Sequence, residues 1–318
     1  MIVILSALAA IIPMSLYLYF IWKYDKYDRE PIKLVLASYL WGAIGAVFLA
    51  FIGSFALNFI VNFFIDDEFG VNFIGAVFIA PFVEEITKGL FLLIIITNKK
   101  FDNLTDGIVY GGAIGLGFGM TENFLYFINN SGNFSEWFNL VVVRSLFSGV
   151  MHLVSTATLG AFLGLSKFMY LPLKITLGLL GLFLAMLIHA LWNFLVSFEI
   201  TVFLGFIFLI LLVIVFFGVF KFSLNRERKM IFKELYEESI NGLIPSSHLH
   251  ILSSTQRDKT GWIDEKIRIP YIKCATTLAF RKRQSKLSKG YSKIFYLEEV
   301  NYYRNQIINL LSQASFTI

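Results

Sequence analysis

The sequence predicts an all-α membrane protein: a polytopic bundle of about seven transmembrane helices followed by a polar C-terminal tail. Two observations support this fold class. Hydrophobic residues make up 57% of the chain and charged residues 15%, against about 45 to 50% and about 25% in a soluble domain. Apolar stretches of about 20 residues, the length that crosses a bilayer, also recur from residue 1 to residue 222.

The apolar stretches give the order of the expected spans. The first, 1–22, has no basic residue ahead of it and no small-residue cleavage site, so we interpret it as a retained helix and not a signal peptide. The second, 33–64, is longer than a bilayer requires and must tilt, protrude, or kink near Gly42, Gly45 or Gly53. The other expected spans are 72–97, 104–128, 138–165, 172–197 and 200–222.

The basic residues of the connecting segments predict the topology. Four of them follow the first span, two lie in 98–103, and none lies in 65–71 or 129–137. Loops rich in Lys and Arg stay in the cytoplasm. We therefore expect a multi-pass membrane protein with its N-terminus outside and its C-terminus in the cytoplasm.

The composition changes after the last expected span, which divides the chain into a transmembrane domain, 1–222, and a basic cytoplasmic tail, 223–318. The tail carries 16 Lys and Arg against 9 Asp and Glu, so it is suited to lie against an anionic leaflet. It has no recognisable nucleic-acid-binding motif, and we expect no nucleic acid among the partners. Segments 224–241 and 294–313 are predicted to be helical. The single cysteine, Cys274, excludes an intrachain disulfide and a cysteine-based zinc site.

Glu84 and Glu85 stand side by side in the middle of the expected span 72–97. A charged side chain at the centre of a membrane helix costs roughly 2.5 to 3.5 kcal/mol on insertion scales, so an unpaired carboxylate pair would be expensive there. Lys88 lies four residues after Glu84 and shares its helix face, while Glu85 points about 100° away. One glutamate can therefore pair with Lys88 while the other faces a cavity.

Other expected spans supply Glu122, His152, His189 and Asn193, at depths between the midplane and the outer face. Two histidines together with a carboxylate pair favour a functional site, although a single membrane histidine often only bonds a neighbouring helix. Glu122 has two readings, a partner of Arg144 or of a histidine, or a catalytic helper. His189 and Asn193 are four residues apart and share a face. Asn193 is equally well explained as an amide bonded to a neighbouring helix.

The span 104–128 carries a stripe of glycines at four-residue intervals, which lets two helix backbones approach closely in lipid. Because Glu122 follows directly after the stripe, tight packing would hold that side chain against its neighbour. Asp102 and Asp106, at the start of the span, are explained by helix capping. The stripe consists of Gly107, Gly111, Gly115 and Gly119.

These residues together resemble the PrsW family of intramembrane endopeptidases, which is similar in motif plan to the CAAX prenyl endopeptidases and bacteriocin-processing proteins. The resemblance covers most of residues 1–197. One departure is Ser148, where the wider group has Phe four residues before its histidine. The matching pieces are Asp25 to Glu30-Pro31, Glu84-Glu85-x-x-Lys88, the glycine-rich span ending in Glu122-Asn123, His152-x-x-x-Thr156-x-x-x-Gly160, and His189-Ala190-Leu191-Trp192-Asn193.

The resemblance implies a protease that cleaves membrane-anchored proteins near the extracytoplasmic side, with a single-pass membrane protein such as an anti-sigma factor as substrate. A glutamate of the pair would act as general base on a water, and a histidine would hold that water or protonate the leaving amine. His189 or Asn193 would stabilise the oxyanion. The partners implied are the lipid bilayer and the substrate, and the location implied is a bacterial cell membrane.

The cofactor is the main alternative left open. Glu85, His152 and His189 would make a zinc set of two histidines and a glutamate, with Glu84 as base. The sequence has no His-Glu-x-x-His motif, which would indicate zinc, and it slightly favours glutamate chemistry without a metal. Two other classes also remain: a non-catalytic scaffold or immunity-type protein, and a proton-coupled transporter, for which we find no pair of related halves.

Overall fold

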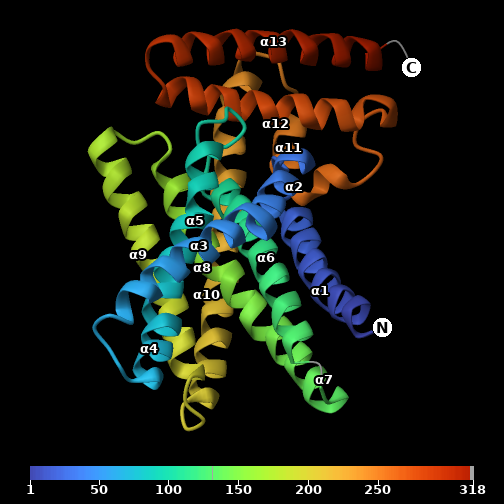
Figure 1. Cartoon of the computed structure of the whole chain (residues 1–318). Coiled ribbons are helices and arrows are strands. Elements are labelled where there is room, and N and C mark those ends of the chain that lie inside the picture. Colours follow the sequence, from blue (N-terminus) through green and yellow to red (C-terminus); the bar gives the residue numbers. More distant parts are fainter. Residues whose placement is uncertain (131, 316–318) are drawn as a thin grey trace. The chain divides into compact units, whose positions relative to one another are not determined.

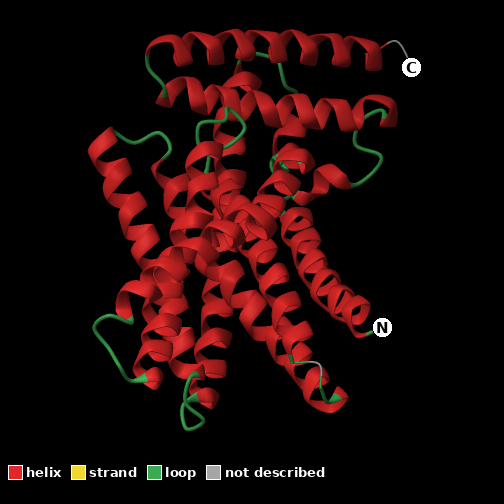
Figure 2. Cartoon of the chain, in the orientation of Figure 1, coloured by secondary structure: helices red, strands yellow, loops and turns green. Residues whose placement is uncertain are grey.

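The computed structural model describes residues 1–130 and 132–315, and all the regular structure within these ranges is helical (Figures 1 and 2). The predicted all-α class is therefore confirmed for the part of the chain that is described. Two sets of residues form separate units. The first contains residues 1–25 and 29–220, and the second contains residues 26–28 and 221–318. We call them the membrane unit and the C-terminal unit.

Five helical stretches among the described residues are long and apolar enough to cross a membrane: Ile2–Tyr24, Ile32–Val61, Phe134–Ser166, Leu171–Val196 and Val202–Ile240. The two other expected spans are also helical, but the charged residues of one and the glycines of the other lower their apolar character. The count of seven spans therefore stays a prediction. The helices of the membrane unit are α1 (Ile2–Tyr24), α2 (Ile32–Leu40), α3 (Val47–Val61), α4 (Glu68–Ile74), α5 (Ala80–Ile95), α6 (Leu104–Asn129), α7 (Phe134–Val143), α8 (Gly149–Ser166), α9 (Leu171–Val196) and the first part of α10 (Val202–Ile240).

Three π-helical segments join consecutive helices of this unit: η1 (Trp41–Ala46), η2 (Gly75–Ile79) and η3 (Arg144–Ser148). They precede α3, α5 and α8. A π-helical turn inserts an extra residue into a helix and occurs often near functional sites. The second span contains η1, which includes Gly42 and Gly45, while its tilt, protrusion or kink stays a prediction.

The glycine stripe of α6 packs against α8, as predicted. A side chain at Gly115 would overlap the carbonyl oxygen of His152, and a Cβ atom at Gly111 would lie 2.5 Å from the carbonyl oxygen of Thr156. The two backbones are therefore in direct contact. This contact fixes the turn of α8 that carries His152 and Thr156.

Polar groups at the ends of α1 and α6 have structural partners. The indole of Trp22 donates to the carbonyl of Glu30 at 2.8 Å, and the hydroxyl of Tyr110 donates to the Glu30 carboxylate. Asn103 and Asp106 form a capping box at the start of α6. The capping role predicted for Asp106 is confirmed.

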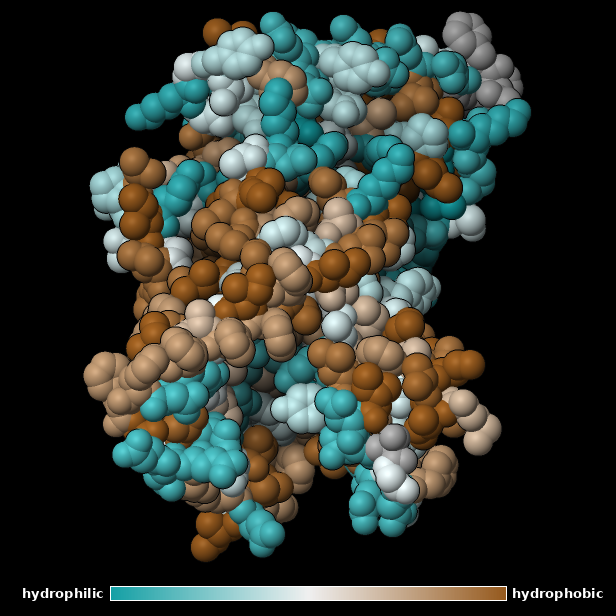
Figure 3. Space-filling model, viewed as in Figure 1, coloured by the Kyte–Doolittle hydropathy of each residue, from teal (hydrophilic) through white to brown (hydrophobic). Residues whose placement is uncertain are grey.

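Large apolar side chains are exposed on the membrane unit, as a lipid-facing surface requires. Phe48 and Phe59 of α3 are each more than half exposed. In the space-filling view, apolar side chains cover much of the visible face of this unit, and hydrophilic ones gather at its loops (Figure 3).

The C-terminal unit is folded around its own apolar core. Its residues Leu235, Leu252, Tyr271, Leu278 and Ile307 are buried and pack together. Both segments predicted to be helical are helical. The unit contains the last part of α10, α11 (Ser246–Leu252), η4 (Thr255–Asp258), α12 (Glu265–Leu287) and α13 (Gly290–Ser315), and α12 and α13 lie side by side (Figure 1).

Candidate active site

Four helices of the membrane unit bring the predicted polar residues into one cluster. Glu84, Glu85 and Lys88 come from α5, Glu122 from α6, His152 from α8, and His189 from α9. Each of the six side chains lies within 4 Å of at least one other member. The convergence inferred from their expected depths is therefore observed.

Glu85 is fully buried, and both of its carboxylate oxygens have hydrogen-bond partners. Its Oε1 accepts from Lys88 Nζ at 2.8 Å and from Ser155 Oγ at 3.2 Å, and lies 3.0 Å from Nδ1 of His189. Its Oε2 accepts from Thr156 Oγ1 at 3.1 Å. A carboxylate with four partners is held in one orientation, so Glu85 is suited to position its neighbours.

Glu84 is the more open of the two neighbouring glutamates. Its side chain is 13% exposed, its Oε2 lies 3.4 Å from Lys88 Nζ, and the same oxygen lies 3.9 Å from His189 Nε2. Its contacts are longer than those of Glu85, and the side chain lines an open groove. Lys88 thus contacts both glutamates, Glu85 more closely, and Glu84 is the one that faces the groove. The sequence predicted that Lys88 would pair with only one of them and placed it on the helix face of Glu84.

Glu122 has both of the partners that the sequence allowed. Its Oε2 lies 2.5 Å from His152 Nε2 and 3.0 Å from Arg144 Nη2. Arg144 also donates to the side chain of Asn123 at 3.0 Å and stacks over the ring of Tyr126. The side chain of Glu122 is still 26% exposed, so it reaches both the cluster and the groove.

The two histidines lie edge to face, with their ring centroids 4.9 Å apart. Nδ1 of His152 lies 2.9 Å from Lys88 Nζ, and the ring of Phe118 packs against both groups. Since an ammonium group can only donate, it favours the tautomer of His152 that carries its proton on Nε2, beside Glu122. Both ring nitrogens of His152 therefore have a partner, Lys88 at Nδ1 and Glu122 at Nε2.

Asn193 makes a different contact from the one its shared face with His189 suggested. Its amide donates to the backbone carbonyl of Ala76 in η2 at 2.8 Å. The alternative reading, an amide bonded to a neighbouring helix, describes this contact. The role of oxyanion donor remains a prediction for Asn193.

A groove of about 380 Å³ runs beside the cluster. Six of its lining residues come from α3, one from α5 and three from α6. The carboxylates of Glu84 and Glu122 face it, and most of its remaining wall is apolar. Water and a peptide can meet both carboxylates there.

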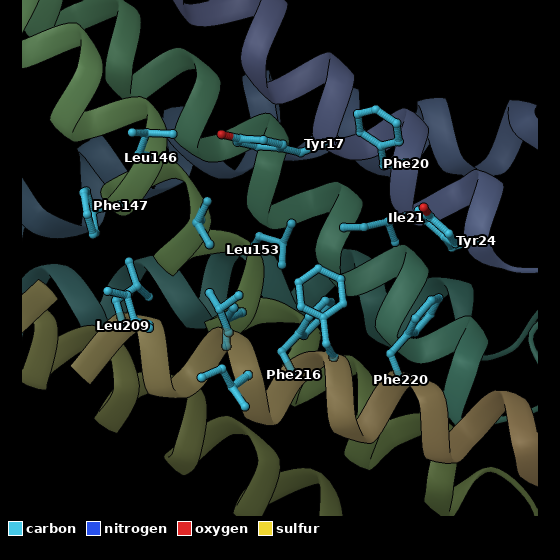
Figure 4. Close-up of a pocket in the computed structure, with 16 residues that line it drawn as sticks. Tyr17, Phe20, Ile21, Tyr24, Leu146, Phe147, Leu153, Leu209, Phe216 and Phe220 are labelled. Atoms are coloured by element: carbon cyan, nitrogen blue, oxygen red, sulfur yellow. The ribbon is translucent and has the colours of Figure 1, made fainter. Parts of the chain in front are cut away.

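The membrane unit also has a larger cavity, of about 600 Å³, between α1, α8 and α10 (Figure 4). Apolar side chains such as Leu153, Leu209 and Phe220 surround it, and its polar groups are the hydroxyls of Tyr17 and Tyr24. Neither a carboxylate nor an imidazole lines it. The larger cavity therefore offers no acid or base, whereas the smaller groove is lined by two carboxylates.

Comparison with known proteins decides the family. Residues 30–220 match the PrsW family of intramembrane metalloproteases. The chain belongs to this family. A protein named Protease PrsW from Oceanobacillus iheyensis is 31% identical over 194 residues, which cover 59% of this chain and 81% of that protein. No solved structure matches the chain.

Two further relatives of the same name are similar over the same region. Protease PrsW of Bacillus subtilis is 28% identical over 192 residues, covering 59% of this chain and 81% of the relative. Protease PrsW of Clostridioides difficile is 30% identical over 162 residues, covering 51% and 66%. This PrsW family member is therefore a membrane peptidase, which sets aside the transporter and scaffold classes.

The cluster also fits the metal that the family name implies. Glu84, His152 and His189 each offer one ligand atom, and these atoms lie within 4.8 Å of one another. Two imidazoles and a carboxylate are a typical set for catalytic zinc. Glu85 holds Nδ1 of His189, as a supporting carboxylate holds a metal-bound histidine. The sequence placed Glu85 in the metal set and Glu84 outside it, whereas the structure reverses these two positions.

Three parts of the site escaped the sequence-based prediction. The contacts of Ser155 and Thr156 with Glu85 were not predicted, although Thr156 belongs to the His152 motif and both residues lie on or near the helix face of His152. The contact between Lys88 and His152 joins two motifs that look independent in the sequence. The wall that α3 gives to the groove consists of residues indistinguishable in type from lipid-facing ones.

Proposed function

We propose that this PrsW family member hydrolyses a peptide bond of a single-pass membrane protein in the groove beside Glu84 and Glu122. One observation carries the proposal. Two carboxylates from different helices line the same groove, and two histidines lie directly behind them. This arrangement suits proton transfer to and from a substrate held in the groove.

The residues can be assigned separate tasks. Glu122 takes a proton from the attacking water as the water oxygen bonds to the substrate carbonyl carbon. The same proton then goes to the leaving nitrogen as the C–N bond breaks. Arg144 and His152 hold the Glu122 carboxylate in position, while Glu85 fixes His189 and Lys88.

Glu84, His152 and His189 would hold one divalent metal, with zinc as the first choice for this donor set. A metal so bound supplies a water with a pKa lowered to about 7 and polarises a carbonyl oxygen. His152 would then exchange its contact with Lys88 or with Glu122 for the metal. The metal-free version of the chemistry leaves the role of general base to Glu84.

The groove supports cleavage on the extracytoplasmic side. It extends along α3 to Asn58 and along α6 to Leu125, toward the segments 62–67 and 130–133. Neither segment contains Lys or Arg, and by the positive-inside rule such loops lie outside. An anti-sigma factor with one membrane span, the substrate implied by the resemblance, has a cleavable segment on that side.

The proposed function is tested by measuring cleavage in reconstituted vesicles. The substrates are single-pass reporter peptides with a short extracytoplasmic segment. Glu84→Gln and Glu122→Gln keep the side-chain shape but remove the charge, and each should lower kcat/KM by about 100-fold to 10,000-fold. Glu199→Gln, at an exposed position after α9, is the matched control. If both groove variants cleave at the wild-type rate, the assignment of the groove carboxylates is wrong.

The orientation has its own test, by cysteine labelling in intact cells. We expect Asn133→Cys, in a Cys274→Ser background, to react with an impermeant maleimide added from outside. Asn133 is exposed at the start of α7. A cysteine at Lys100, in a loop expected to be cytoplasmic, should react only after permeabilisation. The opposite pattern would place the groove on the cytoplasmic side.

A further inference from the structure

The groove has a wall on α3 whose residues follow a helical stripe. They lie 3, 4, 7, 8 and 11 residues after Val47, the first of them, and this is the pattern of one face of an α-helix. Phe118, Glu122 and Leu125 make a similar stripe on α6, opposite the first. The α3 wall consists of Val47, Ala50, Phe51, Ser54, Phe55 and Asn58.

The members of this stripe differ in burial: Val47 and Ala50 pack in an apolar core with Val83 and Phe118, whereas its phenylalanines are exposed. Ala50 is its one fully buried residue, while Phe51 and Phe55 are 73% and 69% exposed. Gly53, outside the stripe, adds a close approach to α5, since a Cβ atom there would lie 2.6 Å from Cγ1 of Val83. The exposed members of the stripe, Phe51 and Phe55, are thus free to face a ligand across the groove.

We infer that the α3 wall is the substrate-binding surface, and that it binds about five residues of the substrate in extended form with small or apolar side chains. This inference rests on the proposed function and specifies its substrate class. From Val47 to Asn58 the wall is roughly 16 Å long at 1.5 Å per helical residue. An extended peptide advances about 3.3 Å per residue, so about five residues fit.

A substrate helix must unwind before it reacts, because its backbone groups are bonded to one another within the helix. The freed N–H and C=O groups then need partners in a site surrounded by lipid. Ser54 and Asn58 bring a hydroxyl and an amide to the end of the wall near residues 62–67. Val47, Phe51 and Phe118 make the other end apolar. A charged substrate side chain would be left without a partner at that end.

The first test fills the groove from α3. Ser54→Trp should lower kcat/KM for an apolar reporter by about 100-fold, because a displacement of about 1 Å in the bound peptide has an effect of that size. Ala56→Trp is the matched control, since it lies two residues away on the same helix, is exposed and does not line the groove. The control should cleave at the wild-type rate.

The second test detects binding without requiring cleavage. In the Glu84→Gln variant, p-benzoylphenylalanine replaces Phe51 in the groove or Ile60, an exposed residue on the opposite side of α3. Two reporter peptides are compared, one with five small apolar residues at the end of its span and one with aspartate among them. Only the photoprobe at residue 51 should crosslink, and mainly to the apolar reporter.

The outcomes separate this inference from the proposed function. If wild type cleaves and folded Ser54→Trp cleaves equally well, the α3 wall is not the binding surface although the enzyme assignment stands. If wild type never cleaves but residue 51 crosslinks the apolar reporter selectively, binding stands and the assigned hydrolysis fails. Equal crosslinking from residues 51 and 60 overturns the inference, and it does so even where Ser54→Trp fails to fold.

Discussion

Two buried lysines of this protein lie among glutamates in different surroundings. In the membrane unit, Lys88 is fully buried and contacts Glu84 and Glu85. In the C-terminal unit, Lys282 is 6% exposed and contacts Glu237 and Glu238 at 3.0 and 2.6 Å. The residue types and distances are similar. The clusters differ in the groups around each lysine, and we therefore expect them to have different functions.

The C-terminal cluster is balanced in charge. Its three glutamates, Glu234, Glu237 and Glu238, are paired with three cations, Lys282, Lys286 and Arg304. These pairs join α10, α12 and α13 over the apolar core. Such a network suits the joining of helices, and we assign it no chemistry.

The membrane cluster is not balanced. It holds three carboxylates, Glu84, Glu85 and Glu122, but two cations, Lys88 and Arg144. With neutral imidazoles one negative charge is left over, beside a groove that two of the carboxylates line. The excess carboxylate and the histidines distinguish a site that can take a cation from one that only joins helices. Burial and pairing of charges do not by themselves indicate catalysis.

The largest difference that we expect between the clusters is their response to metal removal. Purified protein should carry close to one divalent metal per chain, and chelation should abolish cleavage until zinc is restored. A free metal concentration of about 100 times Kd would also stabilise the membrane unit by about 2.7 kcal/mol. Elemental analysis and thermal unfolding of the full chain measure both effects.

Hydrogen exchange in α12 and α13 serves as the internal control for metal removal, since it should not change. Full cleavage by protein shown to be metal-free would remove the metal from the mechanism. The chemistry would then depend on the glutamates alone, as the sequence slightly favoured.

The two lysines give the next largest difference. Lys88→Met should lower kcat/KM by about 100-fold, because Glu85 and His152 both lose the partner that positions them. Lys282→Met should leave cleavage unchanged but destabilise the C-terminal unit by about 3 to 5 kcal/mol, the usual cost of breaking a buried pair. Cleavage assays and hydrogen exchange on both variants separate the two effects.

Lys259→Met, at an exposed position in the C-terminal unit, should change neither measurement. If Lys282→Met loses cleavage while the C-terminal unit stays folded, the assignment of a purely structural role to its cluster is wrong. The two clusters would then share a role in the reaction.

Much of the membrane cluster could be predicted from the sequence. Charged and polar residues are costly to place in lipid, so they stand out within apolar stretches. Apolar runs set the helices, and Glu84, Glu85, His152 and His189 stand out within them as residues that a membrane helix does not retain without a use. The glycine stripe likewise predicted the tight contact of α6 with a neighbour. These inferences depend on residue type and spacing, which the sequence contains.

The orientation of the side chains could not be predicted in the same way. A π-helical turn adds a residue, and each residue turns a helix by about 100°, so η2 and η3 rotate the faces that α5 and α8 present. Which glutamate meets the groove therefore depends on insertions that no residue pattern marks. The packed core of the C-terminal unit was not predicted either, because its apolar residues come from helices rich in charged side chains.

The smallest expected effect is the acid sensitivity of the C-terminal cluster. Hydrogen bonds from Lys286 and Lys282 lower the pKa of Glu237 from its ordinary 4.5 to about 2. Burial would raise the pKa of Glu238, but the hydrogen bonds from Arg304 and Lys282 outweigh it and lower that pKa as well. A group whose pKa falls on folding stabilises the fold above its unfolded pKa. This stability should therefore be lost as the pH falls from about 4.5 toward 2.

Hydrogen exchange of the α12 and α13 amides in the full-length protein, corrected for its intrinsic pH dependence, measures this loss between pH 6 and pH 3. The amides should become less protected below about pH 4.5. Glu237→Gln should flatten the response, because its amide cannot take up the proton. Glu298→Gln, on an exposed part of α13, should keep the wild-type loss of protection.

If Glu237→Gln loses protection at low pH just as the wild type does, the pairs around Lys286 contribute no measurable stability, since their exposed members gain little in water. The packing of Leu235, Leu278 and Ile307 would then account for the stability of the unit.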